Sequence, residues 1–249
     1  MSFVILSQSE EIATVTLQRG KVNALNEPTV DELTEAFQNL EKDRKVESVV
    51  LTGSGKFFSF GFDVPEFLGY AKKDFIRYLE KFANLYTYVF QFPKPVVASL
   101  NGHTIAGGCM LAIACDYRLM VSGKPKISLN EITFGSSVFA GSAEILRFCV
   151  GARNAQAILY SGAMYSAEEA FDLGLVDQVA SEDLLVEDAT GVARELALRN
   201  GPAFRSIKNL LRRPVVEEIM KSEKDSLIEM VDIWYSEPTR KNLRKIKIY

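Results

Sequence analysis

Two places where a buried strand runs through a glycine turn into a helix constrain the fold of this chain more than any other feature. The first turn follows an apolar strand predicted at residues 48–52, and the second follows a similar strand at residues 95–100. A hairpin with strands near residues 3–6 and 12–17 and an amphipathic helix after Pro28 come before both turns. Helices that alternate with buried strands predict an α/β core.

Helical patterns dominate after about residue 140. Gly201-Pro202 opens one helix, and the apolar residues between positions 214 and 234 fall on one stripe with charged residues opposite. We therefore predict an α/β core at residues 1–194 and a helical C-terminal region at residues 195–249. This region would either cover the core or pack on a neighbouring subunit.

The composition excludes several classes of function. With 29 Lys and Arg against 32 Asp and Glu, the chain of 249 residues has a formal net charge of −3, and a mildly acidic protein is a poor binder of nucleic acid. No segment approaches the roughly 18 apolar residues of a membrane span, and the first residues lack a signal-peptide pattern. The three cysteines lack any C-x-x-C pair and suit reduced thiols. We expect a cytoplasmic protein that binds neither nucleic acid nor membrane.

The histidine content narrows the chemistry further. His103 is the only histidine, which leaves no His-rich metal site and one position for a His-paired nucleophile. We expect no bound metal and a structural or substrate-lining role for His103. An acid–base enzyme with this composition would rely on a carboxylate.

The two glycine turns could together stabilise a negative charge. In the first turn Gly61 can adopt a positive φ, and Asp63 is placed to cap the next helix, so that alone the turn is a capped helix beneath a hydrophobic loop. The second turn ends in Gly107 and Gly108 at a helix start, where free backbone N–H groups favour an anion. The amides of Phe62 and Gly107 would then form a two-donor oxyanion hole, which suits a reaction that turns a carbonyl into an enolate.

Five short stretches, two of which contain these turns, lie at residues 22–26, 58–63, 101–109, 115–118 and 167–177. Taken together and in this order, they resemble the crotonase superfamily, also called the enoyl-CoA hydratase/isomerase superfamily. The resemblance implies a ββα superhelical core with C-terminal helices that form trimers or dimers of trimers. It also implies an acyl-CoA thioester substrate, with the thioester oxygen held by the amides of Phe62 and Gly107.

The resemblance also supplies candidate residues and a reaction. The two glutamates of the hydratase branch match Met110 and Glu131, and the acidic residue of other branches matches Phe139, so the aligned site offers one carboxylate. That pattern is similar to the Δ3,Δ2-enoyl-CoA isomerase branch, in which Glu131 would move a proton from carbon 2 to carbon 4 without a metal or redox cofactor. Apolar walls would raise the pKa of Glu131. The expected substrate-binding residues are Ala24, Phe60, Gly61, Asp63, Gly108, Met110, Phe134 and Phe139.

Other interpretations stay open at this level. By spacing alone, Glu131 could equally be a surface glutamate at a strand end. Glu144 is a candidate for a second acid, which would favour a hydratase. Thioester hydrolysis or decarboxylation by a relative of the same superfamily is a further possibility. A different class of function is a non-catalytic acyl-CoA-binding or assembly protein that keeps the fold for oligomerisation.

Overall fold

A mostly parallel sheet forms one layer of the molecule. The computed structural model describes residues 2–248, and within them six strands pair in the order β1-β2-β3-β5-β7-β9. The predicted hairpin is confirmed, because β1 and β2 pair antiparallel, while the other neighbours are parallel. These strands are β1 (Val4–Ser9), β2 (Ile12–Leu17), β3 (Ser48–Gly53), β5 (Val96–Leu100), β7 (Tyr117–Val121) and β9 (Gln178–Ala180).

A smaller parallel sheet lies next to the first. In the described part of the chain it contains β4 (Phe57–Ser59), β6 (His103–Ile105) and β8 (Ile127–Ser128). Each of these strands follows one strand of the large sheet and leads into a helix, which is the ββα unit that the family resemblance implied. The strands of this smaller sheet were not predicted, because two or three residues are too few to show an alternating pattern.

Glycines allow the chain to pass from the large sheet to the small one. A Cβ atom on Gly53 would lie 2.3 Å from the carbonyl oxygen of Phe57, and one on Gly102 would lie 2.1 Å from that of Lys56. Both distances are far below van der Waals contact, so any larger residue would force the backbones apart. Gly53 and Gly102 therefore mark the crossings between the two sheets.

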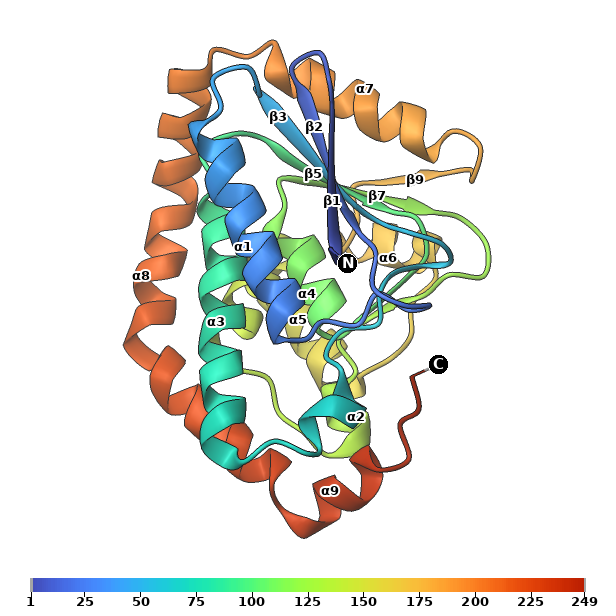
Figure 1. Ribbon diagram of the computed structural model, residues 1–249, viewed down its shortest axis with the longest axis vertical. Helices are drawn as coiled ribbons and strands as arrows, with labels where there is room; N and C mark the ends of the chain where they lie inside the picture. Colours follow the sequence, from blue (N-terminus) through green and yellow to red (C-terminus); the bar gives the residue numbers. More distant parts are fainter. Residues whose placement is uncertain (1, 249) are drawn as a thin grey trace.

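Helices cover both faces of the large sheet. The buried α4 packs between the sheets and the helices α1, α3 and α8, whereas α7 lies across the opposite face (Figure 1). The predicted helices after Pro28 and from Gly201 are confirmed. The helices are α1 (Glu27–Lys42), α2 (Val64–Phe67), α3 (Lys72–Gln91), α4 (Gly107–Ala114), the 3-10 helix η1 (Glu131–Phe134), α5 (Ala140–Ser161), α6 (Ala167–Asp172), α7 (Leu185–Ala197), α8 (Gly201–Trp234) and α9 (Glu237–Leu243).

The C-terminal helices fold back over the core of the same chain. The long α8 runs beside α3 and α5, and α9 turns under the molecule towards α2 (Figure 1). There Thr239 donates a hydrogen bond of 2.6 Å to the carbonyl of Gly135, and Arg240 donates one of 2.9 Å to the carbonyl of Leu68. The predicted boundary at residue 194 falls inside α7, and the division into two domains stays a prediction.

A buried ion cluster, formed by Asp116, Lys208 and Arg212, joins α8 to the sheet. The Asp116 carboxylate lies 2.7 Å from Lys208 Nζ and 3.0 Å from an Arg212 nitrogen, and it also accepts a hydrogen bond from the Val96 amide. Arg212 further donates to the carbonyl of Phe90 near the end of α3 and to that of Ala114 at the end of α4. Burial lowers the pKa of Lys208 to about 8.

Within the described residues, the structure contains no helix long and apolar enough to cross a bilayer.

Candidate active site

The candidate site lies where the three strands of the small sheet end. The first glycine turn follows β4, the second follows β6, and Glu131 comes three residues after the end of β8. Because these strands are parallel neighbours, their carboxyl ends share one edge of the sheet. Ligands in parallel α/β sheets bind at this kind of edge. Three segments that are far apart in the sequence are therefore brought together by strand pairing.

The first turn is held in place by short hydrogen bonds around Gly61. Its φ is +84°, its amide donates to Ser59 Oγ at 3.1 Å, and its carbonyl accepts from the Leu25 amide at 2.7 Å. A Cβ atom on Gly61 would lie 2.7 Å from the carbonyl oxygen of Ile105 and 2.9 Å from the amide nitrogen of Gly107. The two glycine turns are thus in direct contact, and Gly61 is needed for this approach.

The second turn contains backbone strain. Ala106 has φ 50° and ψ −119°, a conformation that residues with a Cβ rarely adopt. Its amide donates to the carbonyl of Ser128 at 2.8 Å, and its own carbonyl accepts from the Met110 amide at 2.9 Å. These contacts fix Gly107 as the first residue of α4. The strained residue, Ala106, directly precedes Gly107, so its backbone angles determine the direction in which the Gly107 N–H points.

The amides of Phe62 and Gly107 are both unpaired within residues 2–248. Neither donates a hydrogen bond to any acceptor within residues 2–248. The Phe62 ring packs on the backbone of Gly107, since a Cβ there would lie 2.8 Å from the ring. Unpaired backbone N–H groups at a buried turn are uncommon, and two neighbouring ones can stabilise an oxyanion.

Glu131 supplies a buried carboxylate next to these turns. It is 5% exposed, and its Oε2 has no hydrogen-bond partner within the described residues. Burial raises the pKa of Glu131 to about 7. Glu131 borders a cavity of about 250 Å³, whose other lining residues are Phe60, Phe62, Val64, Ile105, Ala106, Asn130, Thr133, Phe134, Met230, Trp234 and Ile246.

A second carboxylate does not reach this cavity. Glu131 is the only acidic residue among the described residues that line it. Met110 is fully buried, and its sulfur accepts a hydrogen bond from Ser142 Oγ at 3.2 Å. Glu144 lies on α5, where it faces Arg147 at 3.5 Å. A thioether cannot activate water, so Glu131 is the candidate for proton transfer among the described residues that line the cavity.

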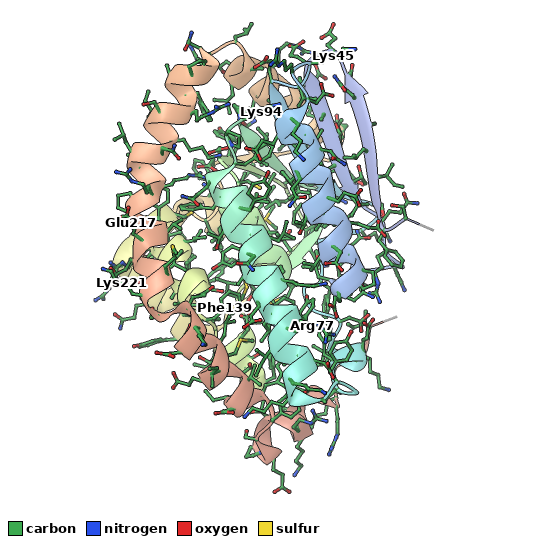
Figure 2. The ribbon with its side chains drawn as sticks, turned by 60° about the vertical axis from the view of Figure 1, so that its left-hand side comes forward. Lys45, Arg77, Lys94, Phe139, Glu217 and Lys221 are labelled. Atoms are coloured by element: carbon green, nitrogen blue, oxygen red, sulfur yellow. The ribbon has the colours of Figure 1, made fainter. Side chains whose placement is uncertain are left out.

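Some of the other predicted residues line the cavity, and the rest lie outside its lining. Phe60, Phe62 and Phe134 line the cavity. Phe139 does not, because its ring is buried against Phe82 and Tyr86 at the start of α5, between α3 and α8 (Figure 2). The remaining four candidates also lie outside the lining, at or beside the turns: Ala24, Gly61, Asp63 and Gly108.

Two of the polar candidates have structural partners. The Asp63 carboxylate accepts a hydrogen bond from the Glu66 amide at 3.1 Å and pairs with Arg19 at 2.7 Å, which confirms the predicted helix cap. His103 Nδ1 accepts from the Lys126 amide at 3.2 Å, outside the cavity lining. Among the described residues, no cluster of three His, Cys, Asp or Glu side chains could hold a metal ion.

The C-terminal part of the cavity wall was not predicted. Met230 and Trp234 reach it from the end of α8, and Ile246 reaches it from the segment after α9. The apolar stripe on α8 indicated a packed face, but periodicity carries no information about which surface that face meets. No pattern in the sequence assigned these three residues to the site.

Comparisons with known proteins agree with this geometry. A family model described as enoyl-CoA hydratase/isomerase matches residues 7–232. A probable enoyl-CoA hydratase of Rhizobium meliloti (strain 1021) is 34% identical over 212 residues, which cover 84% of this chain and 81% of the relative. The mitochondrial enoyl-CoA delta isomerase 1 of Mus musculus is 27% identical over 234 residues, or 93% of this chain and 81% of the relative.

A solved structure extends the similarity to the whole fold. The crystal structure of human mitochondrial delta3-delta2-enoyl-CoA isomerase matches with a TM-score of 0.92 and 25% identity, over 97% of this chain and 95% of that one. The predicted α/β architecture of ββα units is therefore confirmed, and the named relatives include both hydratases and isomerases. This chain belongs to the enoyl-CoA hydratase/isomerase family, the crotonase superfamily of enzymes that act on acyl-CoA thioesters.

Proposed function

We propose that this protein is a Δ3,Δ2-enoyl-CoA isomerase in which Glu131 is the catalytic residue. One observation carries the proposal: a single unpaired carboxylate lines an apolar cavity beside two unpaired backbone amides. A reaction that removes and returns one proton needs one base. The addition of water across a double bond commonly uses a second group to position and activate the water.

The reaction follows from the positions of these groups. The ionised Glu131 takes a proton from carbon 2 of a 3-enoyl-CoA, and the electron pair moves onto the thioester oxygen to give a dienolate. The amides of Phe62 and Gly107 donate to that oxygen and stabilise its charge. The protonated Glu131 then gives the proton to carbon 4, and the double bond forms between carbons 2 and 3. Electrons are only redistributed within the substrate, so the reaction needs no metal and no redox cofactor.

The test is the turnover of 3-hexenoyl-CoA and 2-hexenoyl-CoA by the wild type and by Glu131→Gln, with products identified by mass and chromatography. We expect isomerisation by the wild type with negligible water addition. Loss of a general acid–base group commonly lowers the rate by about 10²–10⁴-fold, and we expect a loss in that range for Glu131→Gln. Glu144→Gln is the matched control, because Glu144 lies outside the cavity. Isomerisation that survives in Glu131→Gln would contradict the proposal.

Hydration is the second candidate, because several relatives are named as hydratases. It predicts that 2-hexenoyl-CoA gains the mass of one water, and that Glu131→Gln and Glu144→Gln lower this activity equally. Release of free coenzyme A or of carbon dioxide from suitable substrates would indicate a hydrolase or a decarboxylase instead. Binding of acyl-CoA without any turnover would indicate a non-catalytic protein.

We also propose that the chain assembles as a homotrimer or a dimer of trimers. Exposed apolar side chains on the outer side of α8 support this assembly, since Ile207, Leu210 and Leu211 are 59–70% exposed. Glu217 and Lys221 project outward farther along the same helix (Figure 2). Sedimentation equilibrium of the wild type and of Leu210→Glu tests the assembly, and a wild type that stays monomeric would refute it.

A further inference from the structure

Trp234 gives the Glu131 cavity a hydrogen-bond donor that nothing in the protein uses. The side chain is 2% exposed and lines the cavity, and its Nε1 has no acceptor within residues 2–248. An indole N–H donates and cannot accept. A buried donor left unpaired is costly, and tryptophan normally finds a partner when it is buried. A missing partner on the wall of a cavity indicates that a ligand supplies it.

The neighbouring contacts hold this ring in place. Trp234 lies against Phe75 with 4.6 Å between the ring centroids. The next residue, Tyr235, donates from its hydroxyl to the carbonyl of Tyr70 at 2.7 Å, which fixes the end of α8. The indole therefore cannot swing out to water without breaking the packing of α8 on α3. The unpaired N–H is therefore held in place beside the cavity that this side chain lines.

The chemistry of the lining limits what the acceptor can be. Among the described residues that line the cavity there is no Lys, Arg or His, and Glu131 is the only ionisable one. A carboxylate on the acyl group would be buried without a counter-charge and near a carboxylate of the same sign. A neutral oxygen has neither problem. Asn130 Oδ1 is also buried and unpaired in this wall, and it would accept from a hydroxyl but not from a ketone.

We propose that Trp234 is a specificity-determining residue whose Nε1–H binds a neutral oxygen on the acyl group, so that the preferred substrates are oxygenated acyl-CoA thioesters. The inference rests on the proposed function in one respect: the cavity must hold the acyl group. It does not require that the enzyme isomerises double bonds. Sites with a buried hydrogen-bonding group discriminate strongly against ligands that leave the group unpaired.

The test is the binding of three unreactive thioesters, hexanoyl-CoA, 4-oxohexanoyl-CoA and 5-oxohexanoyl-CoA, measured by calorimetry. We expect the wild type to bind at least one oxo ligand about tenfold more tightly than hexanoyl-CoA. Trp234→Phe keeps the aromatic ring and removes the N–H, and we expect it to lose that preference. Trp234 is the only tryptophan of the chain, so its fluorescence reports in the wild type whether each ligand reaches this wall.

A matched variant separates the donor from the shape of the cavity. Phe134→Leu changes the lining without removing a donor, and we expect it to alter the affinities for all three ligands by the same factor. Equal affinity of the wild type for all three ligands would overturn the inference, as would a preference that persists in Trp234→Phe. Binding of these ligands without isomerase turnover would overturn only the proposed reaction. Failure to bind any of them would overturn both.

Discussion

The Asp116 cluster and the Glu131 cavity each hold a carboxylate that is largely shielded from water, but the first carboxylate has charged partners and the second has none. Asp116 has two cations and a backbone amide around it, with Lys208 at 2.7 Å and Arg212 at 3.0 Å. Glu131 has an oxygen with no partner, and burial raises its pKa to about 7. The first arrangement holds α8 on the sheet. The second leaves a buried carboxylate oxygen unpaired at a cost in stability, which suits the catalytic role that we propose for Glu131.

The largest expected effect comes from removing the charge of the paired carboxylate. Asp116→Asn leaves Lys208 and Arg212 buried without a counter-charge, and breaking such a cluster typically costs about 3–5 kcal/mol. Urea denaturation at pH 7 measures this loss. We expect the activity per folded molecule to stay near the wild-type value, because the cluster lies away from the cavity. A loss of stability below about 1 kcal/mol would mean that Lys208 and Arg212 do not need Asp116 as a counter-charge.

Removing the charge of Glu131 should instead raise the free energy of unfolding. The ordinary pKa of a glutamate is 4.5 and that of Glu131 is about 7, so the folded state binds the proton more tightly than the unfolded state. The free energy of unfolding therefore falls as the pH rises from about 4.5 to about 7, by up to about 3 kcal/mol. We expect Glu131→Gln to be more stable than the wild type at pH 8.

Denaturation of the wild type and Glu131→Gln at pH 5 and pH 8 measures this difference. The comparison of the two variants at each pH cancels the titration of other groups. The advantage of Glu131→Gln should be small at pH 5 and near its full size at pH 8. A pH-independent difference would mean that Glu131 does not carry the shifted pKa.

The pH dependence of the rate gives a smaller effect. A base must be ionised to accept a proton, so kcat/KM for 3-hexenoyl-CoA should rise about tenfold per pH unit below pH 7 and level off above it. Initial rates between pH 5 and pH 9 test this profile. A plateau that already begins near pH 5 would place the pKa of the catalytic group at its ordinary value and contradict the effect of burial.

The smallest expected effect is that of Lys208→Met. Burial already lowers the pKa of Lys208 to about 8, and after the change Asp116 keeps Arg212 and the Val96 amide as partners. Removing one member of a buried ion cluster is costly mainly when it leaves a charge uncompensated, and here the charge of Asp116 remains compensated by Arg212. We expect the free energy of unfolding to fall by less than about 1 kcal/mol at pH 7. A loss as large as that of Asp116→Asn would show that the cluster acts as one unit.

Much of the fold and of the site could be predicted from the sequence. The hairpin, the helix after Pro28, the Asp63 cap and the place of the two glycine turns follow from local patterns, and the structure confirms them. The pairing of Glu131 with those turns came from motif order. The small sheet was missed because its strands have two or three residues. The place of Trp234 in the cavity wall was missed because a helical pattern does not show which surface its apolar face contacts.

The sequence by itself determined where the backbone can turn and which groups are able to react. Gly61 and Gly107 permit a close approach that no larger residue allows, and the single carboxylate among the aligned positions limits the chemistry. Tertiary structure alone decided the environment of each carboxylate. Burial and pairing depend on side chains contributed by distant segments, so Asp116 received its cations from α8 and Glu131 received none. In the function that we propose, that difference in surroundings separates the structural Asp116 from the catalytic Glu131.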